Sequence, residues 1–256
     1  MRRSAITLIA LALALSLACG SAQAFVIDVD ISALLNRDTI INNGGPGGLD
    51  TVQNGLDSYS FLTQSAATAM YPSNPNGLPD NAFFPANAQH PDVHLSYSNA
   101  DDGNNACWRS GIASFSFGVP ALTYERLDLF VTSAAAATTI DVTLNYADGS
   151  QETVTGMAVP DWFHNTSQAY QYYLIDGLDR ANNNASSYHN ANNPAIFGLM
   201  VYPDDSKFLT SVDIDKTASG GNLVFYGATG TGVPEPATLS LLGLGALALL
   251  RRRRRA

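Results

Sequence analysis

The chain has 256 residues, a formal charge of −9 and hydrophobic side chains at 46% of its positions, enough for a packed core. The charge is uneven, because residues 25–232 hold six of the Lys and Arg but twenty-one of the Asp and Glu, a formal charge of −15. Such an acidic body repels nucleic acid and anionic lipid, which argues against both as partners. Its 208 residues fit one all-β domain.

The first 24 residues have the layout of a secretory signal peptide. Two arginines follow the first methionine, an apolar run covers residues 5–18, and an A-x-A sequence ends at Ala24. This order predicts cleavage after Ala24, with Ala22 and Ala24 as the small residues of the cleavage site. Cys19 raises the alternative of a lipoprotein signal, but Ser16 stands where such signals usually carry leucine.

Removal of the signal peptide leaves a single cysteine, Cys107. An exported protein with one cysteine has no internal disulfide, so its stability must come from a packed core. The local sequence Cys-Trp-Arg matches no nucleophile motif, and we expect Cys107 to be a small buried hydrophobe.

The body shows the period-two pattern of half-buried strands. Residues 140–146 alternate apolar and polar side chains, and the Asp-Gly pair at 148–149 supplies a hairpin turn. No long amphipathic helix is predicted between residues 25 and 236. Many short strands separated by turns predict an all-β fold, an antiparallel β-sandwich or barrel, over residues 25–227. The other predicted strands are residues 25–31, 112–117, 126–132, 171–175, 195–201, 208–214 and 222–226.

Loop composition separates these strands. Residues 42–58, 71–107 and 181–194 are rich in Asn, Gly, Pro and Asp, and we expect them at one end of the sandwich or on its face. Residues 228–232 read Ala-Thr-Gly-Thr-Gly and are expected to form a flexible linker to the C-terminal segment.

The second half of the body resembles the galactose-binding-like jelly roll that many carbohydrate-binding modules share. The resemblance covers residues 121–230 and is carried by the strand patterns LDLFVTSA, VTLNYADGS and VPDWF and by the closing LTSVDIDKTASGGNLVFYGATG. It implies a jelly-roll topology. Carbohydrate binding does not follow from it, because that fold serves many functions.

One acidic loop is a candidate calcium site. Asp101, Asp102 and Asn104 lie around a glycine turn and offer the hard oxygen ligands that calcium prefers. Their spacing does not match an EF-hand, and an ordinary Asx turn is the alternative.

Histidine and tryptophan residues give two further candidates. His90 and His94 have the spacing of a zinc-binding pair, but the proline between them disfavours a helix, so a solvated loop is the alternative. Trp162 and His164 are candidate glycan contacts, since an aromatic ring can stack on a sugar; the alternative is that Trp162 packs in the core. The chain contains no G-x-S-x-G, P-loop or G-x-G-x-x-G sequence, and no catalytic residue is predicted.

The chain ends in an apolar segment and a basic cluster. Residues 237–250 are uncharged, and as a helix they would span about 21 Å, which is short for a hydrocarbon core of about 30 Å. We predict a single, weak transmembrane helix there. Positive charge stays on the cytoplasmic side, so the stop-transfer cluster places the body outside the cytoplasm. The cluster consists of Arg251, Arg252, Arg253, Arg254 and Arg255.

The sequence Val-Pro-Glu-Pro, the apolar segment and the terminal arginines together resemble the PEP-CTERM sorting signal of Gram-negative bacteria, over residues 233–255. The resemblance implies processing by the membrane protease exosortase, with Pro234, Glu235 and Pro236 as the recognised motif and only transient anchoring in the inner membrane. It also implies a cell-surface or extracellular location and an association with exopolysaccharide and biofilm.

These features lead to one principal functional expectation and two alternatives. The principal one is an exported, non-enzymatic protein that associates with surface or matrix polysaccharide. The first alternative is a structural or adhesive protein without a ligand site. The second is a secreted polysaccharide hydrolase or lyase, which would need a pair of carboxylates about 5–10 Å apart.

Overall fold

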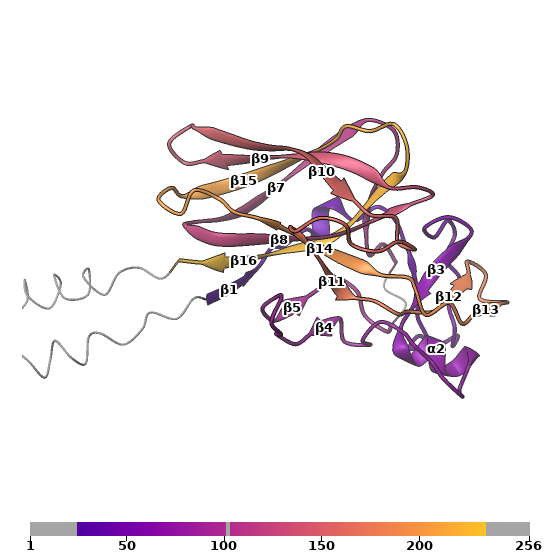
Figure 1. Cartoon of the computed structure of the whole chain (residues 1–256). Helices are drawn as coiled ribbons and strands as arrows, with labels where there is room; N and C mark the ends of the chain where they lie inside the picture. Colours follow the sequence, from indigo (N-terminus) through magenta and orange to yellow (C-terminus); the bar gives the residue numbers. More distant parts are fainter. Residues whose placement is uncertain (1–24, 101–102, 234–256) are drawn as a thin grey trace, which may run out of the picture. The chain divides into compact units, whose positions relative to one another are not determined.

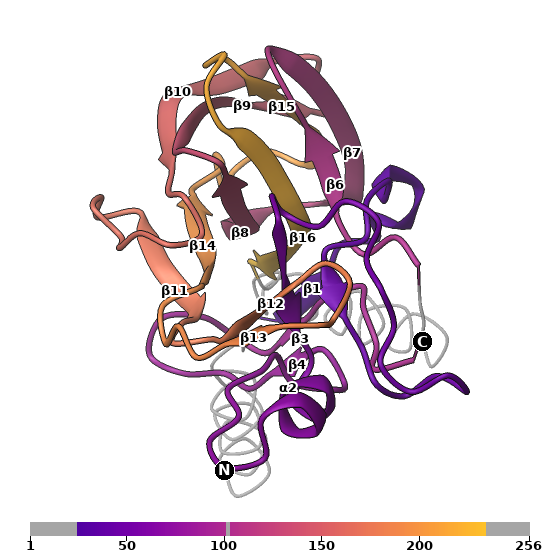
Figure 2. The same cartoon turned by 90° about the vertical axis from the view of Figure 1, so that its right-hand side faces the viewer.

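The computed structural model describes residues 25–100 and 103–233, of which Val26–Gly232 form one compact unit. Figure 1 shows this unit as layers of β-structure, and Figure 2 shows it turned by 90°. Within the two described ranges, no helix has the length and hydropathy needed to cross a membrane.

Several expectations concern residues outside these ranges and stay predictions as far as the structure is concerned. They are the signal peptide and its cleavage site, two acidic members of the calcium candidate, the Pro-Glu-Pro motif, the tail helix and the arginine cluster. The named residues among them are Ala22, Ala24, Asp101, Asp102, Pro234, Glu235, Pro236 and Arg251 to Arg255.

A six-stranded sheet forms the middle layer. Its strands β6, β16, β8, β14 and β11 pair antiparallel. Strands β8 and β16 bury side chains on both faces, as central strands do. The order is β1 (Phe25–Asp28), β16 (Asn222–Gly232), β8 (Tyr124–Ala134), β14 (Ile196–Val201) and β11 (Gln171–Ile175), and β6 (Cys107–Arg109) also pairs with β16.

A four-stranded antiparallel sheet covers one face of the middle layer (Figure 1). Strand β9 alternates buried and half-buried residues along its whole length, so one face packs inward while the other meets solvent. Its order is β10 (Gln151–Val159), β9 (Thr138–Tyr146), β15 (Leu209–Lys216) and β7 (Ala113–Leu122).

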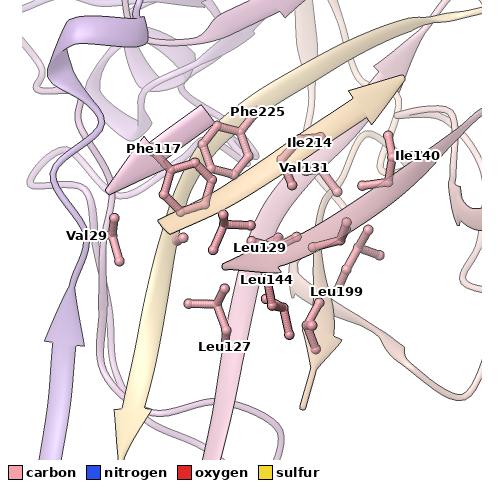
Figure 3. Close-up of a cluster of buried hydrophobic side chains, with 14 of the residues drawn as sticks. Val29, Phe117, Leu127, Leu129, Val131, Ile140, Leu144, Leu199, Ile214 and Phe225 are labelled. Carbon is pink, nitrogen blue, oxygen red and sulfur yellow. The ribbon is translucent and has the colours of Figure 1, made fainter. Parts of the chain in front are cut away.

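The main hydrophobic core fills the space between these two sheets. Leu129 and Phe225 come from the six-stranded sheet, while Phe117, Leu144 and Ile214 come from the four-stranded sheet. Figure 3 shows their side chains converging between the strands. This core therefore holds two antiparallel sheets face to face as a sandwich.

A third layer packs on the opposite face of the six-stranded sheet. It contains a small sheet in which β2 and β3 pair parallel, a short helix α2 capped by the Thr63 hydroxyl, and a two-stranded hairpin. The elements are β2 (Ile40–Ile41), β3 (Tyr59–Leu62), α2 (Gln64–Met70), β4 (Phe83–Phe84), β5 (Val93–His94), β12 (Arg180–Asn182) and β13 (Tyr188–His189). The short 3-10 helix η1 (Ser32–Leu34) packs instead against the main core through Leu34.

A second hydrophobic core joins this layer to the middle sheet. Phe130 and Tyr226 point away from the main core and pack with Phe61 and Leu78 from the third layer and with Trp162 from the segment after β10. Strands β8 and β16 are buried on both faces because each face has its own core.

The all-β class and the antiparallel sheets are confirmed, and each run predicted as a strand overlaps an observed strand. The structure also contains ordered elements that the composition did not predict. The loop-rich stretches contribute β4, β5 and β13 to the third layer, together with several side chains of the second core, and this layer lies on the face of the sandwich. The jelly-roll topology is not confirmed.

The expected linker at 228–232 is not a linker in the structure. These residues continue β16 and pair with β8, from Ala228 opposite Leu129 to Gly232 opposite Tyr124. Small residues occur here because the neighbouring strand leaves little room: a Cβ on Gly230 would lie 2.3 Å from the Tyr124 ring. A stretch whose composition predicts a flexible linker is therefore part of a buried strand.

Candidate functional site

A cavity of about 450 Å³, a volume typical of small-ligand sites, lies at one end of the central strands of the six-stranded sheet, where β8 begins and β16 and β14 end. We call it the Tyr202 pocket. Glu125 and Arg126 on β8, Thr231 on β16, Tyr202 after β14 and the loop 86–91 line it.

A buried carboxylate holds Arg126 in place within the pocket. The Arg126 Nε donates to Asp128 Oδ2 at 2.8 Å, and Asp128 is fully buried. The second carboxylate oxygen of Asp128 accepts a hydrogen bond from the Tyr172 hydroxyl at 2.9 Å. The two bonds use both oxygens of Asp128, so the guanidinium has a fixed orientation before any ligand arrives.

Burial is the main influence on the pKa values of Asp128 and Tyr172. Burial raises the pKa of Asp128, although the Arg126 charge and the Tyr172 hydroxyl act in the opposite direction. The pKa of Tyr172 is raised by burial and then by the neighbouring Asp128 charge, so its hydroxyl stays a donor at neutral pH.

The loop over the pocket is held by hydrogen bonds to both ring nitrogens of His90. The Asn87 Oδ1 accepts from the backbone N–H groups of Gln89 and His90, which identifies Nδ2 as the donor to His90 Nε2 at 2.8 Å. The other ring nitrogen, Nδ1, donates to the Pro91 carbonyl at 2.7 Å. The His90 ring also stacks on Tyr172, with centroids 5.7 Å apart.

The groups open to a ligand are an aromatic ring, an acid and a fixed cation. Tyr202 is 58% exposed, although most large apolar side chains of the body are buried. Glu125 and Thr231 stand beside it, and Arg126 retains partial exposure at its side chain. An exposed ring next to planar hydrogen-bonding groups can bind a sugar, with the apolar face of the sugar on the ring and its hydroxyls on the polar groups.

Comparison with known proteins identifies the C-terminal segment. Residues 232–255 match the PEP-CTERM protein-sorting motif, which has the Pro-Glu-Pro, the apolar stretch and the arginine cluster in this order. The chain carries a PEP-CTERM sorting signal. Such a signal marks an exported exosortase substrate, with a surface or extracellular location in Gram-negative bacteria. No curated protein matches this sequence.

The tryptophan expected as a glycan contact of this PEP-CTERM protein cannot serve as one. Trp162 is 1% exposed and packs edge-on against Phe61, with ring centroids 5.2 Å apart. A ring enclosed on both sides leaves no face for a sugar. His164 is exposed, with Nδ1 3.6 Å from the Asp161 carboxylate.

The metal candidates are only partly described. Asn104 lines a separate polar cavity of about 320 Å³ with Asn36 and Asp38. Among the described side chains, no group of three or more His, Cys, Asp or Glu is placed to hold a metal ion.

His90 and His94 have different partners, since both ring nitrogens of His90 are already bonded and His94 packs on Phe83. His90 is buried, so the expectation of a solvated loop is wrong there.

Cys107 is fully buried, as expected. Burial raises the pKa of its thiol against the opposing charge of Arg109, which disfavours the reactive thiolate.

Sequence reasoning missed the residues of the Tyr202 pocket because they come from strands far apart in the chain. Arg126 and Tyr202 are brought together by the pairing of β8 with β14, in which Leu127 lies opposite Val201. The available signal was Tyr202 itself, an aromatic residue directly before a proline at a strand end.

Proposed function

We propose that the mature protein is a non-enzymatic component of the cell surface or extracellular matrix that binds exopolysaccharide at the Tyr202 pocket and thereby takes part in biofilm. Exosortase would process the chain near its Pro-Glu-Pro motif, after transient anchoring by the tail helix. The two-sheet core would have the jelly-roll topology of galactose-binding-like modules.

The exposed ring of Tyr202 beside the fixed Arg126 is the observation that carries this proposal. Tyr202 is 58% exposed, and a sugar that covers its ring removes apolar surface from water. This burial is the main hydrophobic contribution that a polysaccharide can make to binding. Because Asp128 already orients Arg126, the ligand does not have to order that side chain.

The distribution of carboxylates in the pocket supports binding without hydrolysis. A glycosidase ordinarily needs two carboxylates that flank the scissile bond. Of the residues lining the Tyr202 pocket, Glu125 is the only acid. The nearby Asp128 is buried and both of its oxygens are engaged by Arg126 and Tyr172, so it is not placed to act on a substrate.

The test is binding of the mature protein to the exopolysaccharide of its host, measured by affinity electrophoresis. Tyr202→Ala should weaken binding about tenfold, since an aromatic contact contributes about 1.4 kcal/mol. Phe208→Ala is the matched control, because Phe208 is 54% exposed and does not line the pocket.

The possible results separate the three functional expectations. Wild-type protein that binds no polysaccharide would favour the structural or adhesive alternative. Equal binding by wild type and Tyr202→Ala would place the ligand elsewhere on the body. Release of new reducing ends from the polysaccharide would favour a hydrolase.

A further inference from the structure

Arg180 differs from the other basic residues of the body in its hydrogen bonding. The body has six Lys and Arg side chains, and five of them donate at least one hydrogen bond to a carbonyl, hydroxyl or carboxylate. Arg180 alone donates none to any described residue, and its buried Nε has no partner. No described Asp or Glu oxygen lies within ion-pair distance of it.

Aromatic rings hold the Arg180 guanidinium instead. Its Cζ lies 3.9 Å from the centroid of the Tyr59 ring and 4.3 Å from that of Phe163, and the buried Trp162 is 5.7 Å away. Tyr59 is itself braced by His189, whose ring meets it edge-on at 4.9 Å. These contacts fix the position of the guanidinium without using any of its five N–H donors.

The donors that remain accessible form a fork. The Nε atom is enclosed, whereas the two terminal nitrogens are not among the buried unpaired atoms, and Arg180 as a whole is half-buried. Two parallel N–H donors on a planar cation match the two oxygens of a carboxylate. A partly desolvated guanidinium without an acceptor gains from such a ligand more than a hydrated one does.

We propose that Arg180, held between Tyr59 and Phe163, is a second binding site, and that its ligand is a carboxylate. None of these residues lines the Tyr202 pocket, so this is a separate site on β12, β3 and the segment after β10. The proposal rests on the proposed function only in the source of the ligand, which would be an acidic sugar of the polysaccharide. The body carries a formal charge of −15, so isolated carboxylates on a short chain suit it better than a dense polyanion.

The experiment is isothermal titration of the full mature protein with a hexuronic acid oligosaccharide and with its neutral methyl ester. A salt concentration of about 0.15 M limits the repulsion by the acidic body to about 8 Å. Wild type should bind the acid about 10- to 100-fold more tightly than the ester, the range expected for a hydrogen-bonded charge pair.

Three variants assign this preference to Arg180. Arg180→Gln should abolish it, and Arg180→Lys, which keeps the charge but not the fork, should retain only part of it. Arg109→Gln is the matched control, because Arg109 also packs over a ring, that of Phe115, and its loss changes the net charge equally. Thermal unfolding of each variant confirms that it is folded.

Equal affinity of wild type for acid and ester would overturn the proposal, as would an unchanged preference in Arg180→Gln. Competition by acetate as strong as that by free hexuronate would support a carboxylate site that does not recognise the sugar. Tyr202→Ala separates the two sites: it should weaken polysaccharide binding and leave the preference for the acid over the ester unchanged.

Discussion

Replacing Lys216 with methionine should destabilise the protein, because this buried cation ties two loops together. The alternation of β15 points Lys216 inward, and 1% of the residue is exposed. Its ammonium donates to the carbonyl oxygens of Gly111 at 2.7 Å, Gly220 at 3.1 Å and Ala218. Burial lowers the pKa of Lys216, so the three carbonyls offset a desolvation cost as well as joining the loops.

The expected magnitude follows from these three bonds. A hydrogen bond to a charged group contributes about 1.5–3 kcal/mol, and the burial of the ammonium cancels part of the sum. Methionine retains an unbranched apolar stem and removes all three donors. We expect Lys216→Met to lower the free energy of unfolding by about 2–4 kcal/mol, and Tm by roughly 4–16 °C for a body of this size.

The assay is urea unfolding of the mature protein followed by tryptophan fluorescence. Lys207→Met is the control, since Lys207 is partly exposed and its Nζ lies 3.1 Å from Ser150 Oγ and 3.6 Å from Asp204. This control should change stability by less than about 0.5 kcal/mol. If Lys216→Met stays within that margin, or if Lys207→Met loses as much, the carbonyl cluster does not stabilise the fold as argued.

Three further predictions address alkaline stability, the support of the pocket and processing. Burial raises the pKa of Tyr124 to about 12, so the folded state keeps a proton that the unfolded state releases near pH 10. The free energy of unfolding should therefore fall between pH 10 and 12. Urea unfolding at each pH should show that this fall is smaller by about 3 kcal/mol in Tyr124→Phe. Gly198→Ala would place a Cβ 2.0 Å from the Tyr172 ring, whose hydroxyl donates to Asp128. Calorimetry should show a lower Tm, and binding assays should show weaker polysaccharide binding. Unchanged values would contradict the role of Tyr172 in supporting the pocket. Alanine at residues 234–236 should trap the precursor in the inner membrane of a host with exosortase, as intact-mass analysis of the released fraction will show; release at the wild-type level would mean that the motif is not the recognised element.

The sequence by itself determined the strands of the sandwich and the sorting signal. Residues 140–146 and 209–216 are half-buried strands whose alternation is local, because successive side chains point to opposite faces whatever the rest of the chain does. The sorting signal could be read for a similar reason, since its three parts follow one another along 232–255 and need no fold to be recognised.

Only the tertiary structure decided which faces are covered and where a ligand could bind. Whether the strand at 222–232 is exposed or buried depends on residues such as Leu78 and Leu95, which pack on its second face from the segment 71–107, whose Asn, Gly and Pro content is typical of a loop. The same packing encloses Trp162, whose exposure no local pattern reports. The Tyr202 pocket and the Arg180 site each join residues from different strands, so they exist only once long-range pairing has brought those strands together, and no sequence period encodes such pairing.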